Sequence, residues 1–418
     1  MMKKQEGIKS SHHKIPWGSS VKELQNGIID YSTVAARYAD KSALLAMKKV
    51  YEIAAEGPVP STSQPLVGCL CNLVPEELVR VCGGRPLRLC TEDGMCAKDG
   101  DEIIPGDVCP LIKAICGLAR KDVFERLDLL VIPAACEGKS QISEILSPAC
   151  QIYLLDLPRS NDYLKSANAW EKNLAEFYRF MRNRYNVKPS RRELMRECRS
   201  TNARTKVFRE LYQVRSERPD ILNSFDYFTL SYLSFFHPPE SWLSLALPVL
   251  QETFRAAENS VFPGLRRVLL AGAPIIFPNY KLLEVLENAG CLIGADMLCS
   301  AYGRLYDPVE VDEDTERGII RALALRYIGG SLCPCFVNSG KLNDAAINLV
   351  REYGLDGVVY HNLRLCQPYD IRLTMMRQAT KKENIPFLSI KTDFGQEDIG
   401  QLKTRVEAFL EVLTAQNK

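Results

Sequence analysis

LDLLVIPAAC, residues 127–136, is the stretch that decides the fold class. It is a short apolar run, interrupted only by Asp128, that stops at a proline and is followed directly by Cys136. Such a run predicts a buried strand of a parallel sheet, because helices cover both faces of that kind of strand. A second stretch, LDGVVYH at 355–361, has the same pattern, and Cys366 lies slightly beyond it.

Short apolar runs alternate with helical segments in two series along the chain. The first series begins with LVGCL (66–70) and the second with VLLAG (268–272), and in both a helix and another strand follow. Strands that alternate with helices form parallel sheets with crossover helices. We therefore predict two similar Rossmann- or flavodoxin-like α/β domains facing each other across a cleft. The expected strands are 66–70, 86–89, 127–133, 151–157, 268–273, 291–298, 357–361 and 387–392, with helices at 76–81, 281–288 and 400–413.

The remaining segments carry helical patterns without a convincing strand. Two helical stretches, 31–38 and 42–51, come before the breaker-rich linker EGPVPSTS, which starts at Glu56. Charged and aromatic stretches such as 170–184 predict a helical bridge between the two series. The predicted organisation is an N-terminal helical segment at 1–60, a first α/β domain at 61–164, the bridge at 165–262 and a second α/β domain at 263–418.

Composition excludes several classes of protein. The 418 residues are 46% hydrophobic and 25% charged, as in an ordinary folded protein of two or three domains. The 53 basic and 51 acidic side chains leave a net charge of +2, so nucleic acid and membrane surfaces are not expected partners. The start, MMKKQE, lacks the apolar core of a signal peptide, and the longest apolar stretches, such as 243–250, are too short to span a bilayer. We expect a cytoplasmic protein.

The 15 cysteines are unusual for a chain expected in a reducing compartment, where structural disulfides are rare. Several of them follow predicted strands, at the sheet edge where open parallel sheets bind ligands. Cys109 precedes Pro110 at a predicted helix start, where amides favour a thiolate. The candidate ligands are Cys71, Cys109, Cys136, Cys333, Cys335 and Cys366. Core packing is the expectation for Cys82, Cys116, Cys150, Cys198 and Cys291, and Cys90 and Cys96 stay open.

Common metal and catalytic motifs are missing. No two cysteines have C-x₂-C spacing and only 4 histidines exist, so a zinc ribbon is not expected. The bacterial ferredoxin run is also missing, so any iron–sulfur cluster would be assembled from distant loops. The nucleophile elbow, the P-loop and the dinucleotide fingerprint do not occur.

Several motifs together resemble the 2-hydroxyacyl-CoA dehydratase and benzoyl-CoA reductase family. The resemblance extends from about residue 60 to the C-terminus, and its last motif is the most specific. The motifs are NLVPEEL (72–78), DVCPLIK (107–113), ACEGK (135–139), DMLCSAYGR (296–304) and TDFGQEDIGQLKTRVEAF (392–409).

The resemblance implies a cofactor and partners. In that family two α/β domains surround a buried 4Fe-4S cluster held by three cysteines, which correspond to Cys71, Cys136 and Cys366. A separate ATP-hydrolysing iron–sulfur activator supplies electrons. With the additional Cys109, Cys333 and Cys335, the sequence resembles the double-cubane branch of the family. In that branch the protein is a homodimer, and six cysteines of each subunit hold two bridged cubanes (8Fe-9S). Cys299 could replace one of the six.

Three functions follow from the resemblance. The first is a low-potential double-cubane reductase component that receives electrons from the activator. The second is one subunit of a heterodimeric dehydratase that eliminates water from a 2-hydroxyacyl-CoA, and the third is a non-catalytic scaffold. Glu137, Lys139 and His361 are the candidate catalytic side chains, with a solvated or structural role equally open for each. Departures from the family pattern, CEGKSQ at 136–141 and GAPII at 272–276, leave the substrate unassigned.

Overall fold

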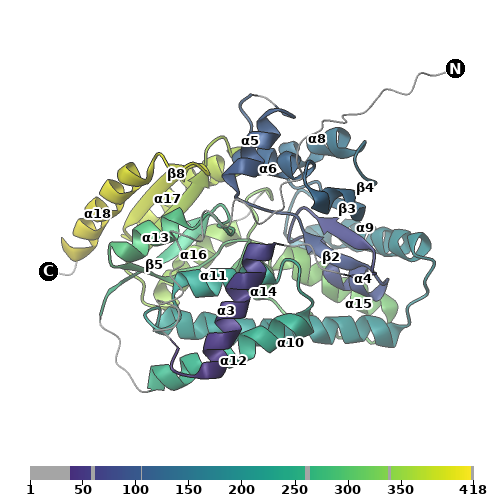
Figure 1. The fold of residues 1–418 in the computed structure, drawn as a ribbon, viewed down its shortest axis with the longest axis horizontal. Coiled ribbons are helices and arrows are strands. Elements are labelled where there is room, and N and C mark those ends of the chain that lie inside the picture. The colour runs from purple at the N-terminus through teal and green to yellow at the C-terminus, as the bar shows by residue number, and fades with distance from the viewer. Residues whose placement is uncertain (1–37, 58–61, 105, 259–263, 338–339, 416–418) are drawn as a thin grey trace.

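The computed structural model describes residues 38–57, 62–104, 106–258, 264–337 and 340–415. It contains two four-stranded parallel sheets, with strand orders β2-β1-β3-β4 and β6-β5-β7-β8. The two orders are the same when each sheet is numbered from its own first strand, so the internal repeat expected from the sequence is present in the topology. The predicted α/β class is confirmed (Figure 1).

The strands lie where the apolar runs predict them. In the first sheet Val67 is in register with Pro86 and Leu129, and in the second sheet Leu270 is in register with Val359. All residues of β1, β6 and β7 are buried, which explains their continuous apolar character. The strands are β1 (Leu66–Cys69), β2 (Arg85–Arg88), β3 (Leu127–Pro133), β4 (Ile152–Leu155), β5 (Arg266–Gly272), β6 (Cys291–Asp296), β7 (Gly357–Leu363) and β8 (Phe387–Thr392).

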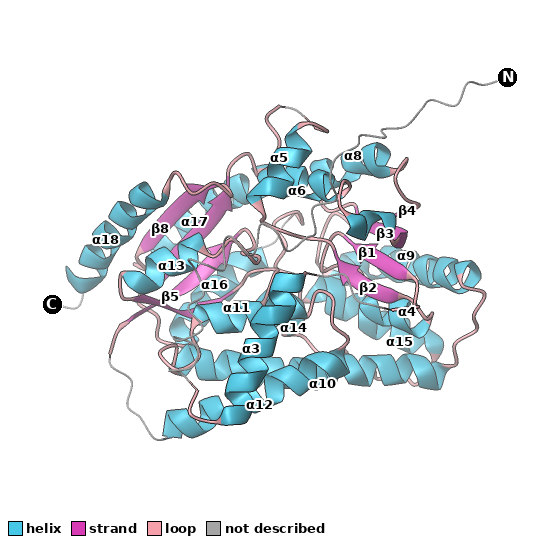
Figure 2. Cartoon of the chain, viewed as in Figure 1, coloured by secondary structure: helices cyan, strands magenta, loops and turns pink. Residues whose placement is uncertain are grey.

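Helices surround the two sheets and also connect them (Figure 2). Within the described residues, 163–258 contain four long helices and no named strand, as the charged and aromatic pattern predicts. The helices are α3 (Lys41–Glu56), α4 (Glu76–Val81), α5 (Gly94–Asp101), α6 (Pro110–Leu118), α7 (Asp122–Glu125), α8 (Glu137–Leu146), α9 (Tyr163–Arg184), α10 (Arg191–Glu217), α11 (Ser224–Leu233), α12 (Pro239–Glu258), α13 (Lys281–Asn288), α14 (Tyr302–Leu305), α15 (Glu316–Ala324), η1 (Leu325–Gly329), α16 (Gly340–Glu352), α17 (Gln367–Lys382) and α18 (Ile399–Ala415).

The predicted N-terminal helix at 42–51 corresponds to α3. Asp40 caps it by accepting hydrogen bonds from the backbone N–H groups of Ser42 (2.8 Å) and Ala43 (3.2 Å). The helix packs on α12 and α11. The other expected helix, 31–38, lies outside the described residues except for Tyr38. The predicted domain boundaries stay predictions.

A buried ionic network joins the first sheet to the bridge and to the second sheet. The Glu76 carboxylate at the start of α4 forms ion pairs with Arg204 of α10 (3.4 Å) and with Arg304 of α14. All three side chains are buried. Charges that have left water need such partners, so this network fixes α4, α10 and α14 relative to one another.

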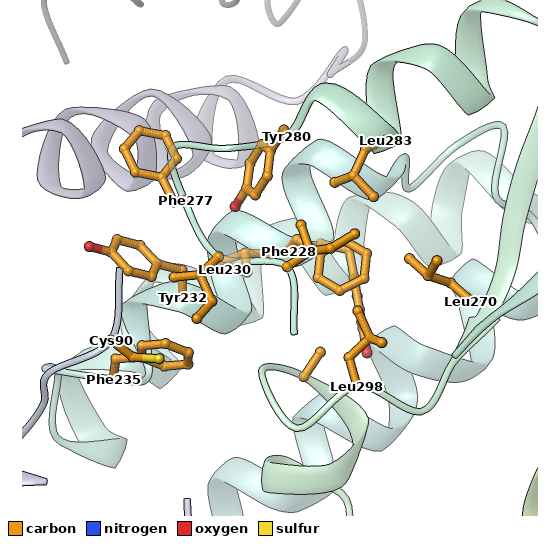
Figure 3. Close-up of a cluster of buried hydrophobic side chains, with 14 of the residues drawn as sticks. Cys90, Phe228, Leu230, Tyr232, Phe235, Leu270, Phe277, Tyr280, Leu283 and Leu298 are labelled. Carbon is orange, nitrogen blue, oxygen red and sulfur yellow. The ribbon is translucent and has the colours of Figure 1, made fainter. Parts of the chain in front are cut away.

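Apolar packing continues from the bridge into the second sheet. The rings of Tyr232 (α11) and Phe277, in the loop after β5, lie 5.5 Å apart, and the Phe277 and Tyr280 rings meet edge to face at 5.7 Å. Figure 3 shows these side chains together with Cys90 and Phe235. None of the helices in the described residues is long and apolar enough to cross a membrane.

The C-terminal motif has a structural role. Lys281, buried at the start of α13, donates to the Asp398 carboxylate (2.7 Å) and to the Gly395 carbonyl, and Thr392 donates to the same carboxylate (2.6 Å). The ion pair holds the pKa of Asp398 below its usual value against the opposing effect of burial. These contacts fix the loop between β8 and α18 against the start of α13.

This ion pair gives a stability prediction. Lys281→Met should lower the free energy of unfolding by about 3 kcal/mol, because it leaves the Asp398 carboxylate, whose side chain is only 10% exposed, without its cation. Lys391→Met is the matched control, since the Lys391–Asp370 pair has side chains 49% and 34% exposed and should change stability by less than about 1 kcal/mol. Urea denaturation measures both, and equal effects would contradict this role for Lys281.

Candidate iron–sulfur site

The six candidate cysteines come together between the two sheets. The thiols of Cys109 and Cys366 are hydrogen-bonded to each other. The Cys335 thiol forms hydrogen bonds with Cys136 and Cys333. The charge of Lys139 acts on Cys71 as well as on the Cys136 set, which places Cys71 in the same group. Loops after β1, β3 and β7 supply Cys71, Cys136 and Cys366, so the carboxyl edges of both sheets meet here.

Three of the thiols belong to residues at helix N-caps. Cys109 caps α6, Cys136 caps α8 and Cys366 caps α17. The backbone amides of Leu111 and Ile112 lower the pKa of the Cys109 thiol, and those of Gly138 and Lys139 lower the pKa of the Cys136 thiol. Free amides at a helix start favour the thiolate, the form that binds metal.

The thiols share protons within their hydrogen-bonded sets. The pKa of Cys136 is lowered to about 5, first by the hydrogen bond with Cys335 and further by the Lys139 charge and the α8 amides. The pKa of Cys335 is raised by its hydrogen bonds with Cys136 and Cys333. In the other set, the hydrogen bond lowers the pKa of Cys109 and raises that of Cys366. In each set the interaction thus favours the thiolate form of one cysteine and the protonated form of its partner.

A close helix crossing positions Cys109. Helices α5 and α6 touch through Gly100 and Gly117: a Cβ on Gly117 would lie 1.8 Å from the Cys96 carbonyl oxygen, and one on Gly100 would lie 1.9 Å from that of Lys113. Only glycine permits this approach. The start of α6, and with it Cys109, is fixed by this contact.

The loop that carries Cys333 and Cys335 is held from both sides. Asn161, beyond the first sheet, donates to the Ser331 carbonyl (2.8 Å), and Ser160 forms a β-bridge with Val337. Arg372 of α17 donates to the Pro334 carbonyl (3.3 Å) and to that of Phe336. These contacts keep the two sulfurs next to Cys136.

The donor set fits a thiolate-bound cluster. All the described cysteines are free thiols. Within the described ranges no three His, Cys, Asp or Glu side chains are arranged around a single metal ion. An iron–sulfur cluster takes one thiolate at each of several iron corners, so its ligands need not converge on one point.

Comparison with known proteins supports a family. A sequence model of the family described as 2-hydroxyglutaryl-CoA dehydratase, D-component, matches residues 71–413. The chain belongs to this family. YjiM of Escherichia coli K12, named as a dehydratase subunit, is 26% identical over 356 residues, which are 84% of this chain and 91% of YjiM.

Two further relatives are beta subunits of named dehydratases. The (R)-2-hydroxyglutaryl-CoA dehydratase subunit of Acidaminococcus fermentans is 23% identical over 83% of this chain and 92% of its own length. The (R)-phenyllactyl-CoA dehydratase subunit of Clostridium sporogenes is 20% identical over 84% of this chain and 92% of its own length. The family resemblance predicted from the motifs is confirmed, whereas the comparisons do not single out the double-cubane branch.

Lys139 lies beside the thiols in this D-component protein, and its catalytic role stays a prediction. Its half-buried side chain extends from the first turn of α8. Burial alone would lower its pKa, but the sulfurs of Cys71, Cys136, Cys335 and Cys333 hold it well above the usual value. Lys139 therefore stays protonated and supplies a positive charge beside the thiolates.

Glu137 and His361 are placed differently from Lys139. Glu137 is exposed on α8, where Gln141 donates to it (2.6 Å). His361 is buried in β7, its Nδ1 is 3.1 Å from the Ala273 carbonyl oxygen, and burial together with the Lys281 charge lowers its pKa to about 4. A catalytic role for these two residues stays a prediction.

Two further cysteines lie at the site beyond the six candidates. Cys299 follows β6, and its charged form would interact with Cys71 and Cys333. Cys90 follows β2, is buried against the aromatic cluster of Figure 3 and interacts with Cys299 and Lys139. The strand-end rule that selected Cys71 could also have selected Cys90.

Asp296 holds the Cys299 turn. Its carboxylate accepts from the Leu298 N–H (3.0 Å) and pairs with Arg215 (2.8 Å), with both side chains fully buried. This explains the aspartate of the DMLC motif.

Glu92 is a buried acid that sequence reasoning missed. It follows β2, its Oε2 accepts from Asn279 across the two halves (3.4 Å), and its Oε1 has no hydrogen-bond partner among the described residues. Burial raises its pKa well above the usual value.

The remaining cysteines behave mostly as predicted. Cys82, Cys116, Cys198 and Cys291 are buried, and burial raises their thiol pKa values. Cys150 is only partly buried. Cys96, left open in the sequence, is buried beside Asp93.

His361 gives a pH-dependent prediction for the apo-protein. Its pKa is about 4 when folded and 6.5 in the unfolded chain, so its neutral form stabilises the fold above pH 6.5 and that stability is lost as pH falls toward 4. Between pH 8 and pH 5 the loss amounts to about 2 kcal/mol. His361→Asn keeps an N–H donor for the Ala273 carbonyl and should remove that part of the acid sensitivity.

Urea denaturation at several pH values measures this difference. His237→Asn is a second variant: the pKa of His237 is also lowered to about 4, so its replacement should remove a comparable part of the acid sensitivity. Identical acid sensitivity of wild type and His361→Asn would contradict the prediction.

Proposed function

We propose that this protein is the iron–sulfur subunit of a 2-hydroxyacyl-CoA dehydratase, which removes water from its substrate to give the 2-enoyl-CoA. The observation that carries the proposal is the meeting of thiols from both sheets in a chain of the D-component family. Cys71, Cys136 and Cys366, each after a strand, are the proposed cluster ligands. The cluster would supply low-potential electrons and an iron site that binds a substrate oxygen.

The protein's own residues would hold and balance this group. The α8 amides and the Lys139 ammonium favour the thiolate of Cys136. The burial of the surrounding strand ends and aromatic residues restricts water, which strengthens these electrostatic interactions. Glu92 is a buried carboxyl that interacts with Cys109. Burial raises its pKa well above the usual value, so it keeps its proton to a higher pH than an exposed acid does.

A partner subunit is part of this proposal. The two relatives from Acidaminococcus fermentans and Clostridium sporogenes are named as beta subunits, which implies other subunits in those enzymes. We propose that this chain likewise pairs with a homologous subunit and receives electrons from an ATP-dependent iron–sulfur activator. Co-expression with a homologous subunit, followed by size-exclusion chromatography, tests the pairing. A stable homodimer would favour the double-cubane reductase component described below.

A double-cubane reductase component is the second candidate. One observation favours it: Cys109, Cys333 and Cys335 join the three family ligands, which gives more thiols than one cubane needs. Iron analysis after anaerobic reconstitution separates the two candidates. About four irons per chain supports the dehydratase subunit and about eight supports the double cubane.

Serine substitutions test the ligand assignment. Cys71→Ser, Cys136→Ser and Cys366→Ser should each weaken iron binding at least about tenfold and reduce the visible absorption of the reconstituted protein. Cys82→Ser and Cys198→Ser, in buried positions away from the site, are matched controls that should keep the iron content of wild type. Full iron retention in all three ligand variants would contradict the assignment.

A further inference from the structure

Arg88 is a buried cation at the edge of the thiol group. It is the last residue of β2, its side chain is buried, and its backbone N–H donates to the Phe235 carbonyl (2.7 Å). The guanidinium carbon lies 4.2 Å from the centre of the Phe235 ring. Packing thus fixes the position of its positive charge.

The Arg88 guanidinium contacts Cys299. Nη1 donates to the Cys299 carbonyl oxygen (3.0 Å) and Nη2 lies 3.9 Å from Cys299 Sγ. The charge also interacts with Cys90 and Cys71. Arg88 therefore connects β2 of the first sheet with the turn after β6 of the second, beside one proposed ligand.

Arg88 differs from three other buried arginines in its lack of an acidic partner. Arg204 and Arg304 pair with Glu76, and Arg215 pairs with Asp296. Across the described ranges no carboxylate lies within ion-pair distance of Arg88, and its buried Nε has no hydrogen-bond partner. Since guanidinium stays protonated in proteins, its burial calls for an anion close by.

We propose that Arg88 is a positioning residue whose charge balances an anionic thiolate-bound cluster and holds the Cys299 turn against it. The inference rests on the proposed iron–sulfur function and extends it. When an external one-electron donor, such as dithionite, reduces the cluster, the added negative charge is stabilised by the fixed cation. The cluster in the wild-type protein is therefore easier to reduce than it would be without Arg88.

The test compares Arg88→Met and Arg88→Lys with wild type. Each protein is reconstituted anaerobically, its iron is counted, and its midpoint potential is measured by EPR-monitored titration with dithionite. Arg88→Met should shift the midpoint to more negative potential, and Arg88→Lys, which keeps a positive charge, should shift it less. Arg85→Met is the matched control: Arg85 lies on the same strand and donates to the Phe236 carbonyl (2.9 Å), so its loss should leave the potential unchanged.

Thermal stability provides a second readout, which tests the inference if Arg88→Met binds too little iron for the redox titration. The variant should lower the Tm of reconstituted protein more than that of apo-protein, because the anion that needs the cation is present only in the former. Equal Tm losses in both forms, or a wild-type midpoint in iron-loaded Arg88→Met, would overturn the inference. Failure of wild type itself to bind iron would instead overturn the proposed function.

Discussion

The rest of the site depends on the buried ion pairs of the Glu76 carboxylate. Glu76 pairs with Arg204 of the bridge and with Arg304 of the second half, and all three side chains are buried. Removing one member would leave uncompensated charge in the interior, so the two sheets are constrained to one relative placement. Only in that placement do the loops after β1 and β3 meet those after β6 and β7.

The site concentrates sulfur and positive charge in a part of the molecule with little water. Helix starts favour a thiolate at Cys109 and Cys136, and Lys139 adds a positive charge beside Cys136. Burial acts in the opposite direction on Cys90 and Cys299, whose pKa values are raised.

The sequence predicts most of the fold, because buried parallel strands leave a continuous apolar signal. β3 and α13 have the bounds expected from the pattern, and α6 begins after Cys109 as Pro110 indicates. The strand-end rule also selected Cys71, Cys136 and Cys366, which the structure brings together with Cys109, Cys333 and Cys335.

Long-range partners could not be predicted in the same way. Arg88 lies on a short strand and its role depends on Cys299, a residue 211 positions away. The solvent exposure of Glu137 likewise depends on which face of α8 meets the sheet, which its short sequence does not determine.

The most direct test of the central claim is anomalous diffraction at the iron edge from anaerobically reconstituted crystals. The account predicts iron peaks between the carboxyl edges of the two sheets, within bonding distance of Cys71, Cys136 and Cys366 sulfurs. Iron bound elsewhere, or no iron peak in protein that shows the expected fold, would contradict it.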